Sequence, residues 1–182
     1  MHYKLTCFIG LILLTYSCSG AKFIKAYSSL DTKKTFTDQI FIKRDITYKV
    51  GDLGQGWELI DLDYGDLAFY SPSLGSTINI NSTCSNARKH YDLTILSDSL
   101  LTGFKNKQLL LRSVVSVNND DALESKYYGE YKNAEVVMSI VVYQKEFCVY
   151  DFSYVSSKPN FDEGYKEYID FIADFRLIEN EE

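Results

Sequence analysis

The sequence predicts an α+β fold, an antiparallel β-sheet covered by helices in the manner of an α/β/α sandwich. Short apolar runs separated by turn residues fill most of the chain, two segments change to helical spacing, and one strand is apolar on both faces. Aromatic residues make up 15% of the 182 residues and prolines number only 2, which favours regular strands. These figures suit one domain of ordinary size.

The first part of the domain is a series of short strands. Turns rich in glycine, aspartate or proline separate the strands that we expect at 41–42, 46–50, 57–60, 67–70 and 76–81. In the last of these, Ile78 and Ile80 share one face, while Thr77, Asn79 and Asn81 point to the other. One side of this strand is therefore apolar and the other polar.

A helix follows at residues 92–105, where leucines and Phe104 recur at helical spacing after Asp92, a suitable N-cap. Three turn signals then divide a four-strand meander at 114–117, 123–131, 134–143 and 147–155. A final helix at 161–176 combines an apolar stripe with a charged side.

Two strands of the meander differ in their pattern. The strand at 134–143 is apolar on both faces, so we expect a layer above it and a layer below. Its neighbour alternates Glu124 and Lys126 with Leu123 and Tyr127, so we expect one of its faces to lie in water.

The N-terminus has the pattern of an export signal. Lys4 precedes an apolar run at 7–14, which is shorter than the roughly 20 residues of a membrane-spanning helix. Residues 14–18, Leu-Thr-Tyr-Ser-Cys, resemble a bacterial lipobox, in which cleavage before the cysteine leaves it as the acylated first residue. An ordinary cleaved signal and an uncleaved anchor are the alternatives.

The lipobox resemblance divides the chain into four parts. We expect a signal peptide at 1–17, a lipidated tether at 18–40, the α+β domain at 41–178 and an acidic tail at 179–182. Palmitate-like acyl chains on Cys18 would hold the domain on a membrane facing the periplasm. Ser19, in place of an aspartate, resembles the sorting pattern of the bacterial outer membrane.

Several strand and turn motifs carry a resemblance to a known family. They are Gly56-Trp57-Glu58-Leu59-Ile60, Gly65-Asp66-Leu67-Ala68-Phe69, Gly75-Ser76-Thr77-Ile78-Asn79-Ile80-Asn81, Gly103-Phe104 and Cys148-Val149-Tyr150-Asp151-Phe152. Together they resemble a group of uncharacterised bacterial lipoproteins similar in outline to the PsbP-type α/β/α sandwich. The resemblance covers about residues 45–176. It implies a scaffold or assembly role and transfers no functional residue.

Charge and histidine content exclude several classes of function. The net charge of −6 argues against a nucleic-acid-binding protein. A serine-histidine-aspartate triad would need His90, and no Gly-x-Ser-x-Gly motif accompanies it. The acidic residues from Glu58 to Asp66 lack the spacing of a calcium loop, so we read them as exposed turn residues. We therefore expect no enzyme, no metal and no cofactor.

Cys84 and Cys148 remain after the signal cysteine and Cys18 are assigned. An exported chain favours a disulfide between them, and closing a loop of this length contributes about 4 kcal/mol in the chain-entropy model. Two separate buried thiols are the alternative.

Four aromatic residues are candidates for an interaction surface or a pocket. They are Trp57, Tyr127, Tyr128 and Tyr131. A place in the core explains Trp57 equally well, and strand propensity explains the tyrosines. The leading hypothesis is a non-enzymatic interaction or assembly module with a protein partner in the envelope. The alternative is a carrier for a small hydrophobic ligand or lipid.

Overall fold

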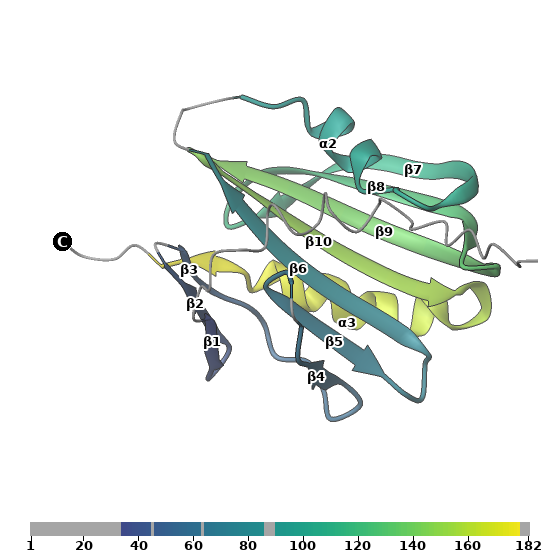
Figure 1. The fold of residues 1–182 in the computed structure, drawn as a ribbon, viewed down its shortest axis with the longest axis horizontal. Coiled ribbons are helices and arrows are strands. Elements are labelled where there is room, and N and C mark those ends of the chain that lie inside the picture. The colour runs from purple at the N-terminus through teal and green to yellow at the C-terminus, as the bar shows by residue number, and fades with distance from the viewer. Residues whose placement is uncertain (1–33, 45, 63, 86–89, 179–182) are drawn as a thin grey trace, which may run out of the picture. The chain divides into compact units, whose positions relative to one another are not determined.

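The computed structural model describes residues 34–44, 46–62, 64–85 and 90–178 (Figure 1). The elements, in chain order, are β1 (Lys34–Thr37), β2 (Ile40–Lys43), β3 (Ile46–Lys49), β4 (Glu58–Ile60), β5 (Leu67–Ser71), β6 (Ser76–Cys84), α2 (Leu93–Ser99), β7 (Lys105–Val117), β8 (Asp120–Tyr131), β9 (Ala134–Lys145), β10 (Cys148–Ser157), the 3-10 turn η1 (Lys158–Asn160), α3 (Phe161–Ala173) and β11 (Arg176–Leu177). In the described part of the chain, no helix is long and apolar enough to cross a membrane.

The strands form two antiparallel sheets, which confirms the α+β class. The larger sheet has the order β4-β5-β6-β10-β9-β8-β7, and the smaller has the order β1-β2-β3-β11. Two-residue turns join β7 to β8 and β8 to β9, and both residues of each turn have positive φ, as type I′ turns require. The asparagines at 118, 119 and 133 tolerate this conformation better than most residues.

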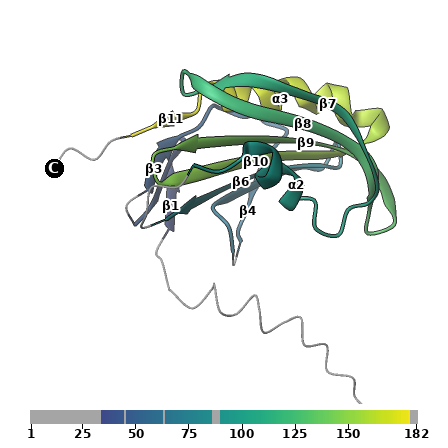
Figure 2. The same cartoon turned by 90° about the horizontal axis from the view of Figure 1, so that it is seen from above.

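Helices cover both faces of the larger sheet, with α3 on one side and α2 on the other (Figure 2). Strand β9 supplies both layers, because Val137, Val141 and Tyr143 pack in the α3 layer while Ile140 and Val142 pack in the α2 layer. The prediction that residues 134–143 lie between two layers is confirmed.

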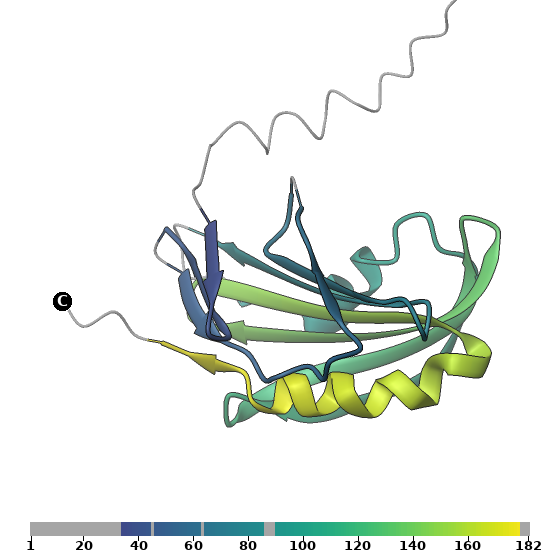
Figure 3. The ribbon, with the colours of Figure 1, turned by 90° about the horizontal axis from the view of Figure 1, so that it is seen from below.

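The α3 face is a continuous aromatic core. Phe175, just after α3, lies 5.0 Å from the ring of Phe152 and 5.3 Å from Tyr48 of the smaller sheet. The chain continues from α3 into β11, which pairs with β3 (Figure 3). Gly164 lets the helix approach closely, because a Cβ atom there would lie 2.5 Å from the hydroxyl of Tyr154.

The α2 face of the larger sheet is less completely covered, because α2 has 7 residues whereas α3 has 13. Asp92 caps α2 as predicted, because its carboxylate accepts from the amides of Thr94 and Ile95. The helix ends at Ser99, however, and β7 begins at Lys105, so the helix is shorter and the strand longer than expected. Two register shifts in β7 interrupt the alternation that would have indicated a strand there.

The predicted tether boundary at residue 40 is wrong. Strand β1 pairs with β2 from Lys34 onward, and Phe36 packs edge-on against Phe69 at 5.9 Å. The sequence of β1, Lys-Thr-Phe-Thr, contains a single apolar residue, so only the pairing partner identifies this strand. The predicted signal peptide, Cys18 and the acidic tail lie outside the described residues.

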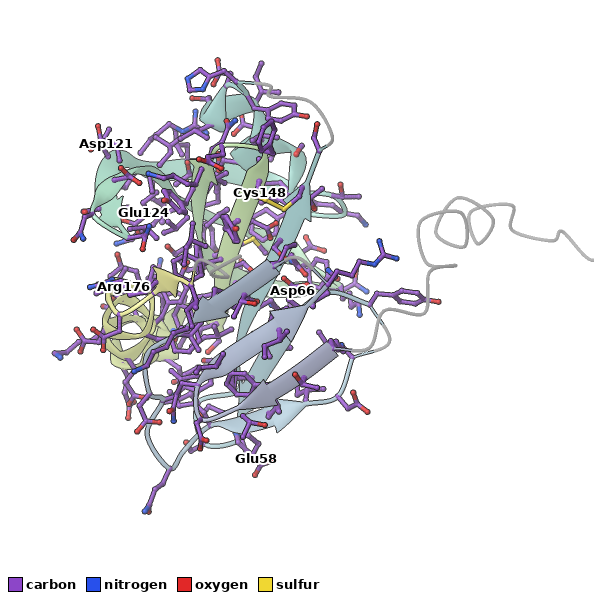
Figure 4. All side chains as sticks on the ribbon, turned by 90° about the vertical axis from the view of Figure 1, so that its left-hand side faces the viewer. Glu58, Asp66, Asp121, Glu124, Cys148 and Arg176 are labelled. Atoms are coloured by element: carbon purple, nitrogen blue, oxygen red, sulfur yellow. A yellow bond between two sulfur atoms is a disulfide. The ribbon has the colours of Figure 1, made fainter. Side chains whose placement is uncertain are left out.

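The predicted wet face of β8 is also wrong at Glu124, which is only 3% exposed. Its side chain points from β8 toward α3 (Figure 4) and accepts hydrogen bonds from Ser139 at 2.8 Å and Tyr165 at 2.6 Å. Lys126 lies 3.7 Å from the same carboxylate and 3.7 Å above the ring of Tyr165. Glu124 can be buried beneath the helix because the hydroxyl groups of Ser139 and Tyr165 satisfy its carboxyl group.

Candidate ligand-binding groove

An open groove crosses the α2 face of the larger sheet. It consists of two hollows, each of about 350 Å³, that share Asn79, Leu100, Met138 and Ser153. Small-molecule sites commonly fall between roughly 300 and 1,000 Å³. The floor comes from β6, β10 and β9, and the segment that follows α2 forms one wall.

A polar strip runs along the floor where β6 pairs with β10. The register places Asn81 opposite Asp151 and Asn79 opposite Ser153. Asn81 donates to the Asp151 carboxylate at 2.9 Å, and Asn79 donates to the Ser153 hydroxyl at 3.3 Å. The strip is the outward side of two strands whose other sides are buried in the aromatic core.

Apart from this strip and the hydroxyl groups of Thr77, Thr102, Ser156 and Ser157, most of the groove lining is apolar. Side chains from β9, β10 and the segment after α2 line it, namely Leu101, Phe104, Val136, Met138, Ile140 and Val155. The two ends therefore differ in character, with the carboxylate of Asp151 in one hollow and Phe104 and Leu101 in the other. This division suits a ligand with one polar end and one apolar end.

Burial raises the pKa of Asp151 from its ordinary 3.8 to about 6. The hydrogen bond from Asn81 opposes this rise, and the negative charge of Asp66 adds to it. Among the described residues, no lysine or arginine forms an ion pair with Asp151. The groove therefore contains a half-buried acid whose charge no described cation balances.

Residues that precede β5 border the acidic end of the groove. Leu62 and Tyr64 line it there, and Gly65 lies against the Asn81 side chain. Gly65 has φ of 87°, and a Cβ atom would lie 2.6 Å from the Asn81 side-chain oxygen, so a larger residue would displace that amide. Lys34 donates to the carbonyl of Leu62 at 2.6 Å, which ties β1 to this loop.

Polar contacts hold α2 over the sheet beside the groove. Asp98 on the helix accepts from Tyr127 at 2.5 Å and from Arg112 at 2.5 Å. The hydrogen bond from Tyr127 is the main reason that the pKa of Asp98 is lowered. Because Leu100 and Leu101 follow directly, these contacts fix the position of the groove wall.

The structure separates the four predicted interaction residues. Tyr131 is exposed and lines the apolar hollow. Tyr127 is buried beneath α2, while Tyr128 points to the opposite face of β8, beneath Lys158. Trp57 belongs to the α3 face, where it lies edge-on to Tyr154 at 6.4 Å and donates to Glu167 at 2.5 Å. Only Tyr131 therefore contributes to the groove.

The disulfide between Cys84 and Cys148 is present (Figure 4). It joins directly opposed residues of β6 and β10, at the ends of the strands that form the groove floor. His90 is exposed. Among the described residues, no group of three or more histidine, cysteine or acidic side chains could hold a metal ion.

Asp66 is not the exposed turn residue that the sequence predicted. It is 3% exposed and pairs with Lys43 at 2.7 Å. Tyr48 and Ser82 also donate to its carboxylate, so it connects the smaller sheet to β5 and β6. Burial between the two sheets, with Asp66 beside it, raises the pKa of Tyr48.

Sequence reasoning missed the groove residues Asp151, Ser153 and Met138. The polar face of residues 77–81 was visible, and residues 150–154 show the same alternation of polar and aromatic side chains. The sequence did not indicate that these two segments pair with each other, because β6 and β10 are separated by more than 60 residues of chain.

A second exposed feature lies at the edge of the larger sheet, where β7 pairs only with β8 among the described strands. Leu109, Leu110 and Leu111 are 47%, 51% and 43% exposed, and Val114 is 67% exposed. Exposed apolar side chains that are contiguous along an edge strand are unusual in a protein that has no partner.

No protein-family model matches the chain, and no curated protein matches it. Solved structures do match. A chain from Bacteroides thetaiotaomicron superimposes with a TM-score of 0.56 and 15% identity, over 84% of this chain and 51% of that one. The present chain thus spans about half the length of that protein.

Two smaller proteins match over most of their length. CyanoP, the cyanobacterial PsbP of Synechocystis sp. PCC 6803, has a TM-score of 0.52 and 9% identity, over 81% of this chain and 92% of CyanoP. LpqN of Mycobacterium tuberculosis, which is involved in cell envelope biogenesis, has a TM-score of 0.52 and 10% identity, over 86% of this chain and 95% of LpqN. At these identities the likeness concerns the fold, and the domain of this chain has a PsbP-like fold.

Proposed function

We propose that this chain is a lipid-anchored protein of the bacterial cell envelope that acts as a non-enzymatic interaction or assembly module. The lipobox-like segment ending at Cys18 supports the anchor, and the fold shared with LpqN supports an envelope role. The domain faces the periplasm from a membrane, with the outer membrane favoured by Ser19. Its partner is another envelope protein.

The apolar edge strand β7 is the observation that carries the interaction role. An apolar segment of a partner protein that lies along β7 would cover Leu109, Leu110 and Val114 and complete the sheet edge. Strand edges of this kind are otherwise protected by charge, proline or a covering element.

A photo-crosslinking amino acid at Leu110 tests the surface in cells. We expect a crosslink to one protein of defined mass, and we expect Val114→Asp to remove it. The matched control is Ile42, which is 46% exposed on the smaller sheet and should give no such product. Equal crosslinking from both positions, or none from Leu110, contradicts the proposal.

Metabolic labelling with an alkyne analogue of palmitate tests the anchor. The label should be lost in Cys18→Ala and retained in Cys7→Ala, since Cys7 lies in the segment that cleavage removes. Label that persists in Cys18→Ala argues against acylation at this residue.

The groove favours a second candidate function, a carrier for a small hydrophobic ligand or lipid. Its apolar lining and its volume suit such a ligand. Native mass spectrometry of the gently purified chain should then show a bound small molecule. A ligand-free mass in repeated preparations argues against the carrier.

A further inference from the structure

We propose that the groove on the α2 face binds a single-chain amphiphile with an amino head group, the amine lying against Asp151 and the hydrocarbon chain along Met138 toward Phe104. This inference rests on the second candidate function and adds the chemistry of the ligand.

The carboxylate of Asp151 supplies the polar half of the argument. It lines the hollow and, among the described residues, accepts a hydrogen bond from Asn81, although a carboxylate can accept several. An ammonium group would provide both the missing charge and further donors. A carboxylate or phosphate head group would instead be repelled at this end.

Two lysines of the neighbouring described segments have other hydrogen-bond or ion-pair partners. Lys34 donates to the backbone carbonyls of Leu62 and Gly65. Lys43 pairs with Asp66, which lies under the opposite face of β6. Asp66 is therefore compensated within the protein, whereas the described residues provide no such compensation for Asp151.

The apolar half of the groove determines the shape of the chain that fits. Met138 and Leu100 line both hollows and form the connection between them. From there the lining continues through Val155 and Val136 to Phe104, which offers a path for one hydrocarbon chain. Asn79 and Ser153, which line both hollows, provide amide and hydroxyl groups for a linker next to the head group.

The unfavourable free energy of burying the Asp151 carboxylate without a described cationic partner also supports a binding role. Burial raises the pKa of Asp151 to about 6, so its ionised form is disfavoured when the groove is empty. A cationic ligand would remove this disadvantage on binding. Groups that destabilise the free protein in this way concentrate at functional sites.

Titration of the full chain at pH 7.5 with decylamine, decanol and decanoate tests the proposal. These probes share one chain length and differ in the head group. We expect decylamine to bind about tenfold more tightly than the other two, as a desolvated charge-assisted contact implies. Asp151→Asn should reduce the affinity for decylamine to that for decanol, while the hydrogen bond from Asn81 is retained.

Two further variants make the test specific. Asp121→Asn removes the same charge from an exposed position on β8 and should leave all affinities unchanged. Met138→Trp narrows the connection between the hollows and should weaken binding of all three probes. Equal affinity of the three probes with no effect of Asp151→Asn overturns the amine inference but leaves the carrier function. No binding of any probe overturns both.

Discussion

The two faces of the larger sheet are built from alternate residues of the same strands, but they are covered differently. On the α3 face, Phe152 and Tyr154 of β10 are fully buried against a helix of 13 residues. On the α2 face, Asp151 and Ser153 of the same strand line an open groove beside a helix of 7 residues. The α3 face is therefore closed by its helix, whereas the α2 face combines a smaller buried cluster with an open groove.

The sharpest contrast between the faces is expected from truncating one side chain on each. Phe152→Ala should destabilise the domain by about 3–5 kcal/mol, because the ring is completely buried and packs edge-on against Phe175. Met138→Ala in the groove should cost less than half as much. Urea unfolding followed by the fluorescence of Trp57 measures both, and equal losses would contradict the division of roles.

Loss of the disulfide should affect the strand pair that both faces share. Cys84→Ser combined with Cys148→Ser is expected to lower the free energy of unfolding by about 4 kcal/mol, since the unfolded chain gains freedom. The thermal midpoint of the reduced wild type should match that of the double variant. Full stability in the variant would show that the β6–β10 pairing needs no covalent support.

Asp151→Asn should stabilise the ligand-free domain at pH 7, by about 2 kcal/mol, although it removes a groove residue. The folded-state pKa of about 6 lies above the ordinary 3.8, so the stability that the protonated acid contributes is present below pH 4 and lost as pH rises to about 6. Thermal melts between pH 4 and pH 7 should show this loss in wild type and not in the variant. Identical pH profiles of thermal stability in wild type and Asp151→Asn would contradict the raised pKa of Asp151.

The smallest effect is expected at the contact that holds α2. Tyr127→Phe removes the hydrogen bond to Asp98 and should cost about 1 kcal/mol. The pKa of Asp98 is lowered in the fold, so its contribution is present above its ordinary pKa and lost as pH falls through the lowered value. Hydrogen exchange of the α2 amides should accelerate in the variant and in acid, while α3 amides remain unchanged. Uniform acceleration would indicate global destabilisation instead.

Sequence patterns predicted elements with local signals well. Asp92 caps a helix, the strand at 134–143 lies between two layers, and turns join the strands of the meander where the turn signals predicted them. Elements without a local signal were missed. Strand β1 has a single apolar residue, Phe36, and the first half of β7 is interrupted by register shifts, so neither shows a period.

The groove could not be found in the sequence because its parts are distant along the chain. Asn81 and Asp151 contact each other only because β10 pairs with β6 as well as with β9. For the same reason Glu124 looked solvated, since nothing near it in sequence indicates that Tyr165 of α3 donates to it.

The sequence by itself determined the α+β class and the order of the main elements, and it favoured a disulfide between Cys84 and Cys148, because periodicity, capping and cysteine number are local or compositional properties. Only the tertiary structure decided which face of each strand is covered. That choice depends on where α2 and α3 dock, and it makes alternate residues of β10 either core, like Phe152, or groove, like Asp151.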